Sequence, residues 1–176
     1  MRTVRDLTTV RTVERLYITG GPGSGKTTLA RWISQRCAIP HFDVDRGETP
    51  PTVAGGAWVV EGAHLWGMAA YVDAADVVVW LDLPLRITGP RILRRHLRLT
   101  ARGRNPHPGV RRLLRFLAAQ PRYHRAAARR ATGPTDWDAL TRSATMELLA
   151  RRDDVVHLRR PTDVSRWLAR IDCHRP

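Results

Sequence analysis

The segment from Gly20 to Thr27 constrains this chain more than any other. It reads Gly-Gly-Pro-Gly-Ser-Gly-Lys-Thr and matches the pattern G-x-x-x-x-G-K-[ST] in full. Glycines allow positive φ angles, so successive backbone N–H groups can turn inward around phosphate oxygens. A helix that begins near Lys26 would point the positive end of its dipole at the same anion. The segment therefore predicts a loop that holds the phosphates of a nucleotide.

The polar residues of this loop have separate expected roles. Lys26 reaches the β- and γ-phosphates, and the Thr27 hydroxyl is a ligand for Mg²⁺. Lys26 is the chain's single lysine, although arginine is abundant. Its compact ammonium on a flexible stem suits a phosphate site. The expected ATP contacts in this segment are Gly21, Pro22, Gly23, Ser24, Gly25, Lys26, Thr27 and Thr28.

Length and composition indicate one globular domain. The chain has 176 residues, of which 43% are hydrophobic and 26% charged. No apolar stretch approaches the roughly 18 residues of a membrane span, and no secretory signal is recognised at the N-terminus. We therefore expect a cytoplasmic protein without a membrane partner. Cys37 and Cys173 are expected to be free thiols, with a disulfide between them as the alternative.

Short apolar runs alternate with helical patterns along the chain. The expected strands are 15–19, 39–43, 57–61, 76–82 and 154–158, and the expected helices are 27–37, 86–99, 110–130, 135–151 and 163–171. This order predicts a three-layer α/β fold with a five-stranded parallel sheet and helices on both faces. A single domain covers residues 1–176, with 1–14 as a flexible extension. Trp32, Trp58 and Trp80 are expected in the core.

Carboxylates follow three of the predicted strands. Asp43 and Asp45 end the second strand, Glu61 ends the third, and Asp82 ends the fourth. Mg²⁺ prefers hard oxygen ligands, so Asp82 and Asp43 are candidate metal ligands. The alternative for Asp82 is a turn before Pro84. Asp43, Asp45 and Glu61 are each candidates for the base that accepts a proton from an acceptor hydroxyl, and the sequence does not separate their roles.

The region after the fourth strand is rich in arginine. Arg91, Arg94, Arg95 and Arg98 lie at helical spacings of three and four, and a loop with glycine and proline follows. Arginines on such a segment can neutralise charge on a phosphoryl group during transfer. We interpret residues from about 96 to 110 as a small lid.

Several blocks together resemble adenylate-kinase-like P-loop kinases over residues 15–125. They include Tyr-Ile-Thr-Gly-Gly-Pro-Gly-Ser-Gly-Lys-Thr-Thr-Leu-Ala-Arg, Ile-Pro-His-Phe-Asp, Trp-Val-Val-Glu-Gly and Ala-Asp-Val-Val-Val-Trp-Leu-Asp-Leu-Pro. The chain is most similar to bacterial proteins labelled DNA topology modulation or adenylate-kinase-related.

The resemblance implies the P-loop NTPase fold with a small Arg-rich lid, and transfer of the γ-phosphoryl group of Mg-ATP to a small acceptor. It also implies that one of Arg91 and Arg95 lies near the adenine and the other near the phosphates, and that Pro161 and Thr162 lie in a loop that contacts the adenine. Glu61-Gly-Ala-His-Leu stands where adenylate kinases carry Asp-Gly-x-Pro-Arg. The acceptor therefore stays open among a nucleoside, a sugar, an antibiotic and other hydroxyl compounds.

The net charge of +14 supports a second hypothesis. A basic surface attracts nucleic acid as well as phosphorylated ligands. A polynucleotide 5′-hydroxyl kinase, or an ATPase or regulatory nucleotide binder, is thus the alternative to a small-molecule kinase. The small-molecule acceptor is the favoured partner, because few aromatic side chains are expected at the surface. Either a monomer or a homodimer fits the sequence.

Overall fold

The computed structural model describes residues 13–63, 66–133 and 136–171. Its five strands are β1 (Arg15–Gly20), β2 (His41–Asp43), β3 (Trp58–Glu61), β4 (Val77–Leu81) and β5 (Val156–Leu158). All four strand pairs are parallel, and the order across the sheet is β2-β3-β1-β4-β5. The predicted five-stranded parallel sheet is confirmed.

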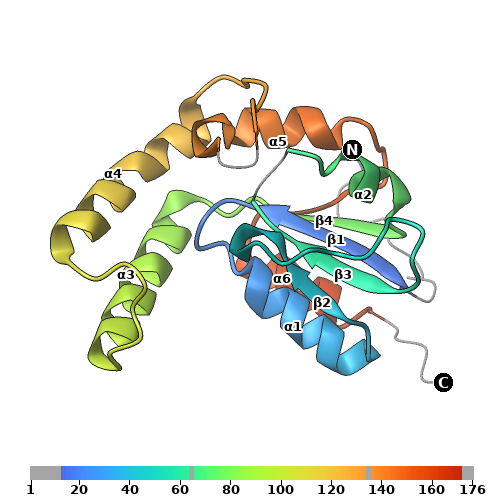
Figure 1. Cartoon of the computed structure of the whole chain (residues 1–176), viewed down its shortest axis with the longest axis horizontal. Helices are drawn as coiled ribbons and strands as arrows, with labels where there is room; N and C mark the ends of the chain where they lie inside the picture. The colour runs from blue at the N-terminus through green and yellow to red at the C-terminus, as the bar shows by residue number, and fades with distance from the viewer. Residues whose placement is uncertain (1–12, 64–65, 134–135, 172–176) are drawn as a thin grey trace.

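Helices cover both faces of this sheet (Figure 1). The helices are α1 (Lys26–Cys37), α2 (Ala69–Ala74), α3 (Leu85–Ala101), α4 (Val110–Arg125), α5 (Arg142–Leu149) and α6 (Pro161–Leu168), with 3₁₀ turns η2 (Val44–Arg46) and η3 (Trp137–Ala139). α1 and α6 pack on one face, where Ile33 and Trp167 join a core with Ile18 of β1. α2 and α5 pack on the other, where Val72 and Leu149 are buried. The result is three layers.

The remaining two helices, α3 and α4, leave the sheet and extend to one side of it (Figure 1). They pack against each other, α4 also packs against α5, and both contact the loop that follows β1. The segment from residue 102 to 109 joins them. The residues predicted as a lid thus comprise the last turns of α3 and this connection.

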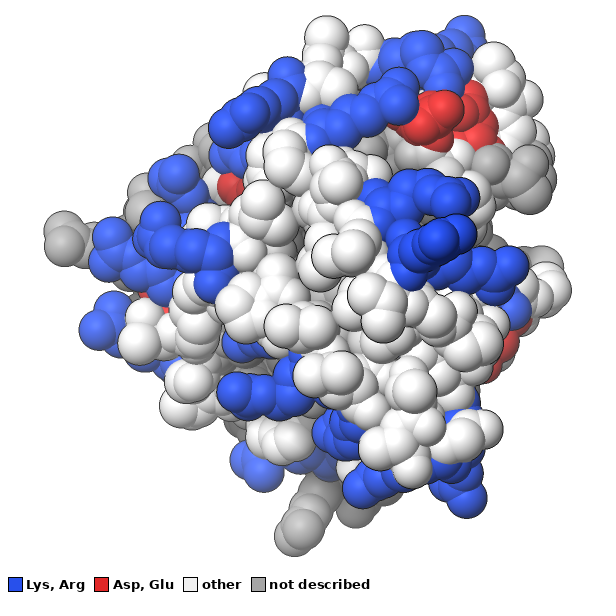
Figure 2. All heavy atoms as spheres, turned by 90° about the vertical axis from the view of Figure 1, so that its left-hand side faces the viewer, with Lys and Arg blue, Asp and Glu red and all other residues white. Residues whose placement is uncertain are grey.

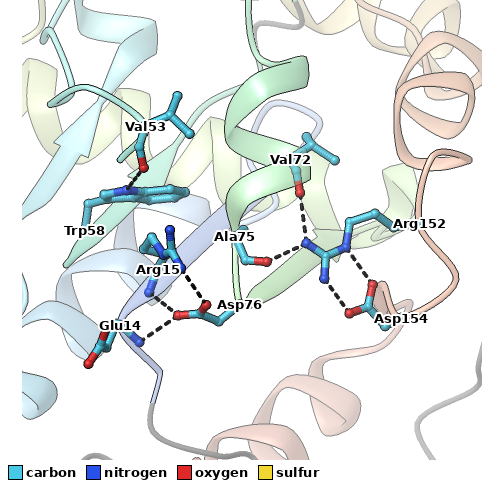
Figure 3. A network of polar contacts seen from close by, with 9 residues as sticks. All are labelled: Glu14, Arg15, Val53, Trp58, Val72, Ala75, Asp76, Arg152 and Asp154. Atoms are coloured by element: carbon cyan, nitrogen blue, oxygen red, sulfur yellow. Dashed lines mark hydrogen bonds and ion pairs between the residues drawn. The ribbon is translucent and has the colours of Figure 1, made fainter. Parts of the chain in front are cut away.

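Polar contacts tie the amino ends of the central strands together (Figure 3). The Asp76 carboxylate accepts hydrogen bonds from the backbone N–H groups of Glu14 (3.1 Å) and Arg15 (2.8 Å), and it pairs with the Arg15 guanidinium at 3.5 Å. Arg152 donates to the carbonyls of Val72 and Ala75 at the end of α2. These contacts fix β4 beside β1, so their opposite, carboxyl ends meet at one edge.

Four details of the chain differ from the sequence-based expectation. Trp32 is 38% exposed and lies under the Arg36 guanidinium, whereas Trp58 and Trp80 are buried as predicted. The helix expected over 135–151 is instead η3 followed by α5. The reason is that Thr141 is extended and caps α5, its hydroxyl accepting from the Ala144 N–H at 3.0 Å.

Helix α2 was not predicted, because its six residues carry no clear helical pattern. Cys37 is disulfide-bonded, which corrects the expectation of two free thiols. Val13 is buried in the core, so the described chain is packed from its first residue. Residues 1–12 of the predicted extension, together with Cys173 and Thr135, lie outside the described residues. No helix in the described residues has the length and apolar character needed to cross a membrane.

Candidate functional site

The glycine-rich loop connects β1 to α1 at the carboxyl edge of the sheet. Gly23 and Gly25 have φ angles of 72° and 100°, and Gly25 is the N-cap of α1. No described side chain caps this helix, so side chains leave its first N–H groups uncovered. The positive end of the helix dipole and these N–H groups form the anion-binding geometry that the motif predicts.

Helices α3 and α4 press directly on this loop. A Cβ atom on Gly21 would lie 2.7 Å from Cε1 of Tyr123, and one on Gly23 would lie 2.8 Å from Cγ1 of Ile92. Arg91 of α3 donates from Nη1 to the Ser24 carbonyl at 3.1 Å. The structure therefore brings Arg91 to the phosphate loop and adds Tyr123 and Ile92, which carry no signal in the sequence.

Lys26 stands at the start of α1 beside a carboxylate. Its side chain is buried, and Nζ lies 3.7 Å from Oδ2 of Asp45. Both oxygens of Asp45 lie 2.9 Å from the donating Ala63 N–H. A Cβ on Gly62 would meet Cγ2 of Val44 at 2.4 Å, so only glycine lets η2 approach the end of β3 this closely. This approach holds Asp45 next to Lys26.

Three carboxylates meet at this place. Asp43, Asp45 and Glu61 each offer an oxygen, and these oxygens lie within 4.8 Å of one another. Asp43 and Glu61 are paired in the register of β2 and β3, which places both strand ends side by side. Asp43 also faces the Arg46 guanidinium at 3.2 Å. The sequence predicted each acid separately, and the sheet order brings them together.

The chemistry of this set fits Mg²⁺. Glu61 is fully buried, and neither of its carboxylate oxygens has a hydrogen-bond partner among the described residues. Buried oxygen atoms without partners are costly, and a divalent cation with oxygen ligands would satisfy them. Thr27, the other expected metal ligand, lies close enough for its hydroxyl to influence Glu61. The residues that could hold the ion are thus Thr27, Asp43, Asp45 and Glu61.

Burial dominates the electrostatics of Glu61. It raises the pKa of this carboxyl to about 7, against the lowering effect of the Lys26 ammonium and the Thr27 hydroxyl. The neighbouring charges of Asp43 and Asp45 raise it further. His41 Nε2 lies 3.7 Å from Glu61 Oε1, but burial lowers the pKa of His41 and favours the neutral ring. Glu61 therefore changes charge near neutral pH.

Asp82 lies outside this group of three. Its carboxylate accepts two parallel hydrogen bonds from Arg142, of 2.9 and 2.7 Å, and His157 Nε2 is 2.8 Å away. Burial alone would raise the pKa of Asp82, but the hydrogen bonds from His157 and Arg142 outweigh it and lower the pKa to about 2. Its oxygens are thus occupied by protein groups, and the metal assignment for Asp82 stays a prediction without geometric support.

A cavity of about 550 Å³ opens beyond Asp82, at the carboxyl ends of β4 and β5. It is lined by Asp82, Pro84, Arg86, His124, Arg142, Arg159, Arg160 and Asp163. Pro161 and Thr162, the predicted adenine contacts, lie between two of these residues at the start of α6. The predicted base-binding segment therefore borders this cavity. Arg95 and Thr28 are placed on α3 and α1 with exposed side chains.

The strand order and the loop after the central strand define the P-loop NTPase fold, as the sequence predicted. No protein-family model and no curated protein matches the chain. Among solved structures, the chain is similar to a gluconokinase from Sinorhizobium meliloti 1021, with 13% identity, 89% of this chain and 95% of that chain covered, and a TM-score of 0.43.

Two further structures are similar to the same degree. A shikimate kinase from Bacteroides thetaiotaomicron has 13% identity over 90% of this chain and 96% of its own, with a TM-score of 0.43. A sugar kinase from Janibacter sp. HTCC2649 has 15% identity over 91% and 94%, with a TM-score of 0.41. All three are kinases, but likeness at this level carries no argument about activity. The resemblance to adenylate-kinase-related proteins stays a prediction.

Proposed function

We propose that this chain is an ATP-dependent phosphotransferase that moves the γ-phosphoryl group of Mg-ATP to a hydroxyl or phosphate of a small acceptor. One observation carries the proposal. The carboxylates of Asp43, Asp45 and Glu61 lie beside the phosphate-binding loop, and Lys26 at the end of this loop lies next to Asp45. Phosphoryl transfer needs this combination of charge neutralisation, metal ligands and a base.

The phosphates are held by the main chain and by two cations. Backbone N–H groups from Gly21 to Thr27 surround the triphosphate, and Lys26 contacts its β- and γ-phosphates. Arg91 stands beside the loop, where Nη1 of its guanidinium donates to the Ser24 carbonyl at 3.1 Å. Bound Mg²⁺ would neutralise the β- and γ-oxygens. The base and ribose would extend past Arg91 toward Pro161 and Thr162.

Burial separates the roles of the three acids. The side chains of Glu61 and Asp43 are 0% and 6% exposed, whereas that of Asp45 is 24% exposed. A base must reach an acceptor that enters from solvent, so we assign this role to Asp45. Glu61 and Asp43, with the Thr27 hydroxyl, are then the groups that hold Mg²⁺, directly or through water.

Transfer moves a proton from the acceptor to Asp45 and the γ-phosphoryl group from ATP to the acceptor. Asp45 takes the proton of the acceptor hydroxyl while the hydroxyl oxygen bonds to the γ-phosphorus. The bond from that phosphorus to the oxygen bridging the β- and γ-phosphates breaks, and ADP leaves with the electron pair. Lys26, Arg91 and Arg95 neutralise the charge on the moving group.

A screen with ATP labelled on the γ-phosphate tests the proposal. The acceptors to be tried are nucleosides, nucleotides, sugars and aminoglycoside-like compounds, with wild type and Asp45→Asn side by side. We expect label transfer to one class, reduced at least roughly 100-fold by Asp45→Asn with little change in ATP affinity. Steady ATP hydrolysis with no acceptor labelled would replace this proposal by an ATPase. A cytoplasmic location and the oligomeric state stay predictions.

A further inference from the structure

The positive charge of the chain is concentrated in one structural unit. Residues 85–125, which form α3, the connection and α4, contain twelve arginines and no aspartate or glutamate. The whole chain has 30 basic and 16 acidic residues, so the two charges nearly balance elsewhere. We call residues 85–125 the arginine arm. The arm stands away from the sheet (Figure 1), so its charge is presented to solvent.

The arginines of the arm are arranged in stripes. At 100° per residue, five arginines of α3 and its C-cap fall within an arc of about 100°, and they extend along roughly 16 Å of the helix. These residues are Arg91, Arg94, Arg95, Arg98 and Arg102. On α4, Arg111, Arg115 and Arg122 fall within an arc of about 40°. Figure 2 shows the outer face of the arm, where blue side chains are widespread and red ones lie at the margins.

Most of this charge is not neutralised within the described residues. Arg122 pairs with Asp138 at 3.2 Å, and Arg91 is bonded to Ser24. No ion-pair partner is present in the described part of the chain for four exposed arginines, two on each helix: Arg94, Arg98, Arg111 and Arg115. Unpaired guanidinium groups in rows match the repeated phosphates of a polyanion, because each can bind a phosphate through two nitrogens.

We propose that the arginine arm is a docking surface for the phosphate backbone of nucleic acid. Repulsion between two such surfaces disfavours a second copy of the chain. A membrane helix at an interface exposes an apolar face opposite its basic face. On α4, Leu113 and Tyr123 are buried, whereas Leu114 and Phe116 are 59% and 46% exposed beside the arginines. Twelve arginines without an acidic residue favour a polyanion as the partner, and competition with phosphatidylserine vesicles separates nucleic acid from a membrane surface.

This surface overlaps the candidate active site at Arg91 and Arg95 and extends away from it along both helices. Arg91 begins the stripe on α3 and contacts the phosphate loop, while Arg111 and Arg115 lie on the other helix. Nucleic acid bound along the arm would therefore have one end near the glycine-rich phosphate loop. The proposal needs neither ATP nor phosphoryl transfer, so it stands or falls separately from the proposed function.

The test compares two variants that remove the same charge. The arm variant replaces Arg94, Arg98, Arg111 and Arg115 by Gln. The control variant replaces four exposed arginines away from the arm, namely Arg31 and Arg36 of α1, Arg166 of α6 and Arg170 just after α6. Fluorescence anisotropy measures binding of a labelled strand of about 20 nucleotides and its duplex over a salt series without ATP.

The wild type is expected to bind with a steep salt dependence. The arm variant should lower the slope of log K against log[salt] by about 3 and weaken binding at least roughly tenfold, while the control variant changes the slope by less than about 1. Replacing the same four arm residues by Lys keeps the charge and should keep most of the slope. All variants should show the wild-type thermal melt, since the replaced side chains are exposed.

Three outcomes would overturn the proposal. One is no binding of either probe by wild type at low salt. Another is an equal loss in the arm and control variants, which would indicate net charge without a dedicated surface. The third is binding to phosphatidylserine vesicles that the oligonucleotide does not displace, which would assign the arm to a membrane surface.

Discussion

The ammonium of Lys26 lies 3.7 Å from the carboxylate of Asp45, although the two residues come from different strand–loop connections of the sheet. The two opposite charges attract each other at this distance. The same lysine is the group expected to contact the β- and γ-phosphates. A bound triphosphate would therefore compete with Asp45 for the Lys26 ammonium. The attraction between Lys26 and the Asp45 carboxylate would then be weaker when the acceptor binds.

Replacement of Lys26 by Ala tests this relationship. We expect loss of Mg-ATP binding by at least about 100-fold and loss of transfer, because the main ammonium contact to the phosphates is gone. Isothermal calorimetry measures the affinity. Lys26→Arg is the matched control that keeps the charge and changes its shape, and it should bind more tightly than Lys26→Ala. Unchanged affinity in Lys26→Ala would contradict the assigned site.

Glu61 should make both stability and nucleotide binding depend on pH. Its pKa is raised to about 7 in the folded chain from an ordinary value of 4.5, so the folded state holds more protons than the unfolded state between these values. The free energy of unfolding then falls as pH rises from about 4.5 through 7 in metal-free buffer. Mg²⁺ and ATP should bind more tightly over the same rise, because the metal needs the ionised carboxylate.

Thermal melts of wild type and Glu61→Gln, with EDTA and with Mg-ATP, measure these two effects. Without metal, the melting temperature of the variant should change less across this pH range than that of the wild type. Mg²⁺ should stabilise the variant little at pH 8. A Glu61→Gln profile that parallels the wild type under both conditions would count against Glu61 as the titrating metal ligand.

Asp82 is expected to be structural. Replacement by Asn removes the charge that Arg142 and His157 share, and it should lower the free energy of unfolding by roughly 2–4 kcal/mol. Urea denaturation measures this loss. The Mg²⁺ concentration for half-maximal ATP binding should stay within about twofold of wild type. A large rise in that concentration would instead restore Asp82 as a metal ligand.

Gly21 should not tolerate a side chain while Tyr123 is present. Gly21→Ala would place a Cβ 2.7 Å from the Tyr123 ring, so the loop or α4 must shift. We expect at least roughly tenfold weaker ATP binding. The double variant Gly21→Ala/Tyr123→Ala removes the clash and should recover part of the affinity lost by the single variant. Additive losses in the two single variants would argue that the contact does not matter.

The local pattern of residues was enough to predict the parallel sheet, the phosphate loop and α1, since each depends on neighbours in sequence. Glycines before Lys26, and apolar runs such as Val77–Leu81, have few alternative structures. The same reasoning failed for Trp32, because helical spacing does not show which side of a helix meets the sheet. It also failed at residues 135–141, where Thr141 starts the helix later than the acidic residues suggested.

The sequence by itself determined that a nucleotide-type phosphate loop exists and which acids follow the strands. Only the tertiary structure decided which acids meet. The order β2-β3-β1 places Glu61 and Asp43 beside the start of α1. Arg142, 60 residues after Asp82 in the sequence, donates hydrogen bonds to the Asp82 carboxylate. The pairing of strands and the contacts between distant segments decide such groupings, because they depend on packing of the whole chain and leave no mark in the local sequence.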